Sequence, residues 1–169
     1  LDRIRPVLQH YGFNEIISFS FSDPAREAVL GNGIAPVEIR NPISAKASHL
    51  RTSLLGGLLE AAAWNRNRGL EAVQIFEAGH VYGREEQATR EWPVLGLLCT
   101  GPLGEPHWRG PARPSDLFRI KGVLEAVMAQ TRYEPCSFDS VDHPYFEAGS
   151  ALALTYKEQA VGWLGKVGA

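Results

Sequence analysis

The stretch that decides the fold is residues 72–82, which read AVQIFEAGHVY. Its β-branched and aromatic side chains predict a long β-strand. Gly79 lies inside this strand, where a glycine indicates either a bulge or a group that approaches the backbone closely. The run VLGLLC at 94–99 predicts a second strand, and its apolar residues on both faces are typical of a central strand. We expect the charged residues 83–91 between them to form an exposed loop.

Further elements precede this pair of strands. Residues 15–21 read EIISFSF, and their β-branched and aromatic residues, with Ile17, Phe19 and Phe21 in alternation, predict a strand. Asp23 and Pro24 then predict the start of a short helix, and residues 4–11 predict another one that ends at Gly12. A longer helix is predicted over residues 52–68, capped by Thr52 or Ser53, with apolar side chains around much of its circumference.

Downstream, Ser115 is expected to cap a helix, and residues 151–156 and 160–164 predict a β-hairpin. Hairpins and helices therefore alternate along the chain without the regular βαβ order of a parallel sheet. The economical fold class is α+β, with a mostly antiparallel sheet flanked by helices. We expect one domain over residues 1–169, and a first residue other than Met suggests a fragment of a longer chain.

Composition excludes several classes of protein. The 169 residues carry 17 basic and 19 acidic side chains, for a formal charge of -2, so no basic arm for nucleic acid is evident. A hydrophobic content of 44% is enough for a core and excludes general disorder. No apolar run is long enough to cross a bilayer, and the two cysteines form no C-x-x-C pair. A cytoplasmic location away from membranes is expected.

Two arginines are candidates for a functional role. Arg84 follows the strand at 72–82 and could hold a phosphate through two hydrogen bonds, although the alternating charges around it favour a solvated turn. Arg51 lies at the start of the long helix, where a positive charge opposes the helix dipole. It therefore predicts a carboxylate partner, either across an interface or within the core.

The residues alone predict no catalytic, cofactor-binding or metal site. None of the histidines considered has a second histidine or a cysteine at metal-binding spacing; these are His49, His80, His107 and His143. The acidic cluster around His143 lacks the ligand spacing of a calcium loop and is explained by turn chemistry; it comprises Asp139, Asp142 and Glu147. The common fingerprints of serine hydrolases, P-loops and dinucleotide-binding folds are missing.

The order of several motifs is more informative than any one residue. Together they resemble the bacterial phenylalanine-tRNA ligase β-subunit family over essentially the full chain. The matching segments are YGFNEIISFSF (11–21), NPIS (41–44), RTSLLGGLL (51–59), IFEAGHVY (75–82), GLLCTG (96–101), DLFRIKG (116–122) and VGWLG (161–165).

The resemblance implies a core domain like that of class II aminoacyl-tRNA synthetases, but without catalytic activity. By this resemblance, the site that activates phenylalanine with ATP and Mg²⁺ lies in the α subunit, within an α2β2 assembly that binds tRNA(Phe). The fragment itself would hold no cofactor, and its function would be to support the α-subunit active site. Two alternatives stay open: a self-standing adenylate-forming enzyme related to class II synthetases, and an RNA-binding module.

The resemblance also makes expectations for particular positions. A catalytic class II copy has an arginine on a strand that holds the α-phosphate of ATP, and the corresponding position here is Gly83. Arg84 is displaced by one residue, which turns a strand side chain to the opposite face. The long helix corresponds to a part of the fold near the subunit contacts. We therefore predict subunit-interface roles for Arg51, Leu54, Leu55 and Leu58.

Overall fold

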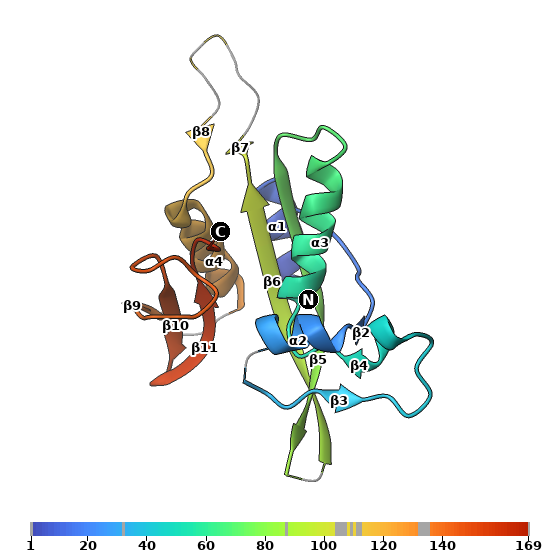
Figure 1. The fold of residues 1–169 in the computed structure, drawn as a ribbon. Helices are drawn as coiled ribbons and strands as arrows, with labels where there is room; N and C mark the ends of the chain where they lie inside the picture. The colour runs from blue at the N-terminus through green and yellow to red at the C-terminus, as the bar shows by residue number, and fades with distance from the viewer. Residues whose placement is uncertain are drawn as a thin grey trace. The chain divides into compact units, whose positions relative to one another are not determined.

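The computed structural model describes residues 2–31, 33–86, 88–103, 108, 110, 113–131 and 136–168 (Figure 1). The chain divides into two compact units. One unit combines Leu1–Phe13 with Gly101–Ala169, and the other is Asn14–Thr100. The single domain expected over residues 1–169 stays a prediction.

A long hairpin dominates the unit 14–100, and Figure 1 draws it as the two longest arrows, with α3 beside them. Its strands belong to a three-stranded sheet of order β1-β5-β6. β1 is parallel to β5, whereas β6 is antiparallel to it. Pairing of β5 with β6 runs without interruption from Val73↔Thr100 to Glu85↔Ala88, so no bulge occurs at Gly79. The strands are β1 (Asn14–Glu15), β5 (Val73–Glu85) and β6 (Ala88–Thr100).

Two expectations for this hairpin are wrong. Residues 83–91 are not a loop, because both strands continue to a tight turn that includes Glu86 at a φ of 57°. The charges there pair across the hairpin, with Arg90 Nε 3.1 Å from Glu85 Oε2. The second error concerns the run 94–99, which belongs to the edge strand β6. The central strand is β5, and both of its faces are buried, as Ile75 and Phe76 show.

The strand expected over residues 15–21 is also wrong, because only its two ends are paired. β1 occupies the start, and β2 begins at Phe21 in a second antiparallel sheet of order β2-β4-β3. The middle of the segment leaves the sheet because the backbone N–H of Ser18 donates to a side-chain oxygen of Glu77 at 3.2 Å. The remaining elements here are β2 (Phe21–Ser22), β3 (Val37–Glu38), β4 (His49–Leu50) and the 3-10 helix η1 (Ala45–Ala47).

Two helices complete this unit. α2 (Pro24–Leu30) is capped as expected, since Asp23 Oδ1 accepts from the N–H of Ala25 at 2.9 Å. α3 (Leu55–Arg66) packs on β5 and β6, and Ser53 Oγ accepts from the N–H of Leu55 at 3.1 Å. The core between helix and sheet consists of Leu54, Leu58, Ala62, Val73, Ile75 and Val81.

The other unit pairs two helices and a small sheet. α1 ends at His10, and Gly12 just beyond it has a φ of 84°, the left-handed conformation expected there; α1 also contacts α4. The α4 cap is Asp116 and not the expected Ser115, since Asp116 Oδ1 accepts from the N–H of Arg119 at 2.8 Å. The expected hairpin is confirmed as β10 and β11 within an antiparallel sheet of order β11-β10-β9. The bounds are α1 (Ile4–His10), β7 (Pro102–Leu103), β8 (Arg113–Pro114), α4 (Leu117–Thr131), β9 (Ser137–Ser140), β10 (Leu152–Tyr156) and β11 (Gln159–Leu164).

Every strand pair but β1–β5 is antiparallel in the part of the chain that the structure describes. Helices pack on two of the sheets, with α3 against β5 and β6 and α4 against β11. The α+β class expected from the sequence is therefore confirmed. Among the described residues, no helix is long and apolar enough to cross a membrane.

Candidate functional site

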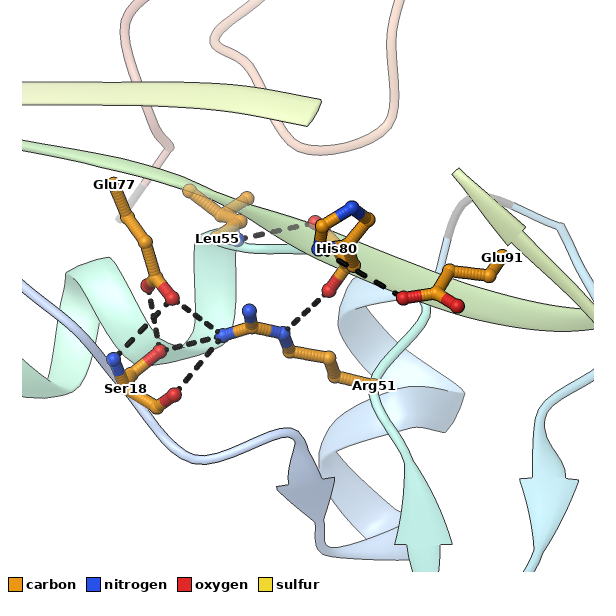
Figure 2. A network of polar contacts seen from close by, with 7 residues as sticks. Ser18, Arg51, Leu55, Glu77, His80 and Glu91 are labelled. Carbon is orange, nitrogen blue, oxygen red and sulfur yellow. Dashed lines mark hydrogen bonds and ion pairs between the residues drawn. The ribbon is translucent and has the colours of Figure 1, made fainter. Parts of the chain in front are cut away.

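The guanidinium of Arg51 lies at the centre of a network of polar contacts in the unit 14–100 (Figure 2). Its Nη1 donates to Glu77 Oε1 and to Ser18 Oγ, each at 2.8 Å. Its Nε donates to the backbone carbonyl of His80 at 2.9 Å. Arg51 thus joins the segment after β1 to two positions along β5. We call Ser18, Arg51 and Glu77 the arginine network.

Glu77 completes the arginine network from the other side. Both of its oxygens accept hydrogen bonds from Ser18, whose hydroxyl lies 2.6 Å from Oε2 and whose backbone N–H lies 3.2 Å from Oε1. The side chains of Arg51 and Glu77 are only 8% and 3% exposed. The carboxylate partner predicted for Arg51 therefore lies within the core of its own unit. Burial of both charges is tolerated because each has an ionic partner and further hydrogen bonds.

The residues of β5 leave space for the guanidinium of Arg51 beside the strand. Side chains alternate along β5, so Glu77 and Gly79 face the same side of the strand. A Cβ atom at Gly79 would lie 2.6 Å from Arg51 Nη2, so a larger residue would displace the guanidinium. The expectation of a close approach at Gly79 is therefore confirmed. The backbone N–H of Tyr82 also donates to the carbonyl of Arg51 at 2.8 Å, which fixes the residue against β5.

A second buried carboxylate anchors the neighbouring residue. Glu27 of α2 accepts through Oε2 from the backbone N–H of Thr52 at 2.8 Å and from its hydroxyl at 2.5 Å. Glu27 is 8% exposed and Thr52 is fully buried. The segment before α3 is thus held on one side by β5 and on the other by α2.

Sequence reasoning missed Ser18, Glu27 and Glu77. The alternation of serines at positions 18, 20 and 22 is the signal that could have indicated Ser18.

The leucines predicted for the subunit interface fall into two groups. Leu54 and Leu58 are 3% and 2% exposed and belong to the core between α3 and the sheet. Leu55 is half-buried and is the most accessible of the three. Their role at an interface stays a prediction.

The position that corresponds by resemblance to a phosphate-binding arginine is tightly packed. Gly83 is buried on β5, where a Cβ atom would overlap Cγ2 of Ile34 and would lie 3.2 Å from Cζ3 of Trp92. Arg84 is exposed, and its backbone N–H donates to the carbonyl of Ala35 at 2.9 Å. The space that a phosphate-binding side chain would need at position 83 is therefore filled by apolar groups.

In the unit 1–13 with 101–169, His143 lies within a group of aromatic side chains. The ring of His143 has its centroid 4.9 Å from those of Tyr145 and Phe146 and 5.5 Å from that of Trp163. Burial among these rings lowers the pKa of His143. Glu147 is paired with Lys166 at 2.9 Å.

Asp139 is also engaged locally, since the hydroxyl of Ser137 donates to its side chain at 2.8 Å. Over the described residues, no three His, Cys, Asp or Glu side chains converge in a way that could hold a metal ion. His107, one of the histidines considered from the sequence, lies outside the described residues.

Comparison with known proteins shows the family. The sequence model described as "Phenylalanyl tRNA synthetase beta chain CLM domain" matches residues 1–169. The chain belongs to this family. Similarity to curated relatives supports the same family assignment. The resemblance inferred from the order of the motifs is therefore confirmed. The phenylalanine–tRNA ligase β subunit of Vibrio cholerae serotype O1 is 34% identical over 171 residues, and that of Thiobacillus denitrificans is 35% identical over 164 residues.

These alignments cover 99% and 97% of the CLM domain, but only 22% and 20% of the two relatives. The chain thus spans about a fifth of the length of the curated relatives it matches. Among solved structures, pyrrolysyl-tRNA synthetase from Desulfitobacterium hafniense is similar, with a TM-score of 0.66 and 16% identity over 94% of this chain and 52% of that one. At this identity the likeness concerns the fold alone, and it confirms the class II synthetase-like architecture.

Proposed function

We propose that this chain is a non-catalytic core domain of the β subunit of phenylalanine-tRNA ligase. Its role is to support the α subunit, whose active site attaches phenylalanine to tRNA(Phe) with ATP. The proposal starts from membership of the CLM family. The chain covers about a fifth of its relatives, so the activity belongs to a larger assembly.

The observation that carries the proposal is the packing at Gly83. A phosphate-binding arginine at this position would need space that Ile34 and Trp92 occupy. Arg84 cannot take over the role without a shift, since β5 and β6 pair in unbroken register and neighbouring side chains of a strand point to opposite faces. Packed apolar side chains therefore occupy the position where a catalytic copy would bind nucleotide.

The polar groups next to this position support the same conclusion. Arg51 and Glu77, which meet on this face of β5, bind each other and are almost fully buried. Neither is available to a nucleotide. We assign ATP and Mg²⁺ to the α subunit of the complete ligase, as the family resemblance implies.

In this proposal the domain works within a cytoplasmic α2β2 heterotetramer. Its partner is the α subunit, and tRNA(Phe) is bound by the whole complex. Buried anchors such as the arginine network and the Glu27–Thr52 pair would give the domain the rigidity that a supporting body needs.

A test replaces Arg84 by alanine in the complete β chain and measures aminoacylation of tRNA(Phe) by the assembled ligase. Because Arg84 is exposed and its backbone hydrogen bond remains, the variant should fold and assemble. We expect kcat and KM for ATP to stay within roughly twofold of the unchanged enzyme, whereas loss of a transition-state contact would cost on the order of 100-fold.

The matched control is Arg90→Ala, which removes an exposed arginine on the paired strand. Nucleotide binding is measured separately, by calorimetry of the β chain without the α subunit. Binding of ATP that depends on Arg84 but not on Arg90 would overturn the proposal in favour of a self-standing adenylate-forming enzyme.

A further inference from the structure

The C-terminal end of α3 carries an exposed aromatic ring with a cation stacked on it. Trp64 is 55% exposed, although it belongs to a helix whose other face packs in the core. The guanidinium carbon of Arg68 lies 3.5 Å from the centroid of the Trp64 ring. Arg66 and Arg68 are themselves exposed. We call Trp64, Arg66 and Arg68 the tryptophan patch.

The two arginines of the tryptophan patch keep their positive charge uncompensated. Arg68 Nη1 donates to the backbone carbonyl of Trp64 at 3.2 Å, and Arg66 Nη1 donates to that of Glu71 at 2.9 Å. Within the described part of the chain, neither guanidinium has a carboxylate partner. Residues 61–70 also contain no acidic side chain. Since a guanidinium has several N–H donors, most donors of both arginines are available to an anion.

A purely structural role explains only part of this arrangement. Positive charges at the C-terminal end of a helix complement the helix dipole, which accounts for the two arginines but not for an exposed tryptophan. Arg68 is held against one ring, so its other face is free to stack on a second planar group. RNA-binding proteins stack unpaired bases on such guanidinium planes and bind phosphates through arginine. An acidic peptide would use the charges but not the stacked plane.

We propose that the tryptophan patch binds an unpaired nucleotide of tRNA(Phe), whose base stacks on Arg68 and whose phosphate accepts hydrogen bonds from Arg66. The inference rests on the proposed function, which supplies the RNA. The nucleotide is unpaired because bases inside an RNA helix are already stacked on their neighbours. Trp64 is a positioning residue, since it holds the guanidinium of Arg68 flat. The contact is local, in keeping with a chain that has no basic arm.

The test measures binding of fluorescently labelled tRNA(Phe) to the ligase assembled from complete α and β chains, by anisotropy at several KCl concentrations. Trp64→Ala and Arg68→Gln should each raise the Kd about fivefold or more through the lost stacking. Arg66→Ala should make the dependence of log Kd on log salt shallower by about 1. Trp64→Phe keeps a ring beneath Arg68 and should retain most of the affinity.

The matched control is Arg40→Ala, which removes an exposed positive charge from the same unit. Arg40 follows β3, and Figure 1 shows β3 well away from the end of α3 that leads to β5. This variant should bind tRNA(Phe) as tightly as the unchanged ligase. Patch variants that bind as tightly as Arg40→Ala would overturn the inference.

The occupant is identified by a photo-crosslinking amino acid in place of Asn67, which is exposed and lies between the two arginines in sequence. Crosslinks to an unpaired nucleotide of tRNA(Phe) are the expected result. Crosslinks only to protein, or only to helical RNA, would contradict the inference. An unchanged ligase that does not bind tRNA(Phe) at all would instead contradict the proposed function, so the two failures are distinguishable.

Discussion

The Nη1 atom of Arg51 lies 2.8 Å from Oε1 of Glu77, in a pair of side chains that are almost completely buried. Such a pair contributes little net stability, because the desolvation of two charges offsets their attraction. Removing only one of the two partners is costly, because the other charge then stays in the interior without its ionic partner. The pair is therefore better understood as an anchor that fixes where Ser18 and β5 meet.

Replacement of Glu77 by glutamine should destabilise the domain by about 3–5 kcal/mol, because the Arg51 charge would stay buried without its ionic partner. Urea unfolding followed by tryptophan fluorescence measures this loss. The control is Glu85→Gln, which breaks the exposed pair with Arg90 and should cost about 1 kcal/mol or less. Equal losses in the two variants would contradict the anchoring role.

Replacement of Thr52 by valine should lower the free energy of unfolding by roughly 1–3 kcal/mol. The change keeps the shape of the side chain but removes the hydroxyl that donates to the buried carboxylate of Glu27 at 2.5 Å. Thr52→Ser keeps that donor and should lose distinctly less. If the valine variant is as stable as the serine variant, the hydroxyl makes no net contribution.

Gly83→Ala tests how tightly the position corresponding to the phosphate-binding arginine is filled. The added methyl group would overlap Ile34, so we expect a loss of about 1–3 kcal/mol. Ile34→Ala in the same chain should restore part of this loss, and a double-mutant cycle measures the coupling. Gly122→Ala adds a methyl group to α4 with nothing within 4 Å and should instead stabilise by about 0.5–1 kcal/mol. Additive effects of the first two substitutions would rule out the overlap.

Leu55 and Leu58, which both belong to α3, should respond differently to substitution. Leu58→Ala creates a cavity in the core and should cost about 2–5 kcal/mol, measured by thermal or urea unfolding. Leu55→Asp places a charge at a half-buried position and tests the interface predicted there. We expect it to weaken binding of the α subunit while the near-ultraviolet circular dichroism stays unchanged. A Leu55→Asp variant that assembles normally would remove this residue from the interface.

Acid should weaken the unit that contains His143. Burial lowers the pKa of this histidine in the folded chain, whereas the unfolded chain takes up the proton at the ordinary value of 6.5. The stabilising contribution is therefore complete above pH 6.5 and is lost as the pH falls toward the lowered value. His143→Phe keeps a ring among Tyr145, Phe146 and Trp163 but does not titrate. Its melting temperature should depend less on pH between 7 and 5, and an identical pH dependence would exclude His143 as the cause.

The sequence predicts most elements of this fold because their signals are local. Asp23 with Pro24 marks the start of α2, and Gly12 marks the end of α1, since each satisfies a backbone requirement at its own position. The tight turn at Lys157 and Glu158, both with positive φ, separates two clear strand patterns. Such features depend on a few neighbouring residues, so one sequence is enough to read them.

The errors arise where distant residues compete with local preference. Residues 15–21 have a strand pattern, but Glu77 captures Ser18 from 59 positions away and draws the backbone out of the sheet. Charges at 83–91 are typical of a loop, yet the pair Arg90–Glu85 forms between strands. For the site, the sequence predicts that Arg51 has a carboxylate partner but cannot name it, because β5 brings Glu77 into reach only in the folded domain.

The packing of Gly83 between Ile34 and Trp92 also limits which substitutions could turn this position into a phosphate site. An arginine introduced there by one mutation would overlap Ile34 and contact Trp92, and should therefore destabilise the hairpin. Smaller residues at 34 and 92 would have to appear first, and each alone leaves a cavity with no compensating gain. A single substitution at position 83 is therefore not enough to place a phosphate-binding side chain there.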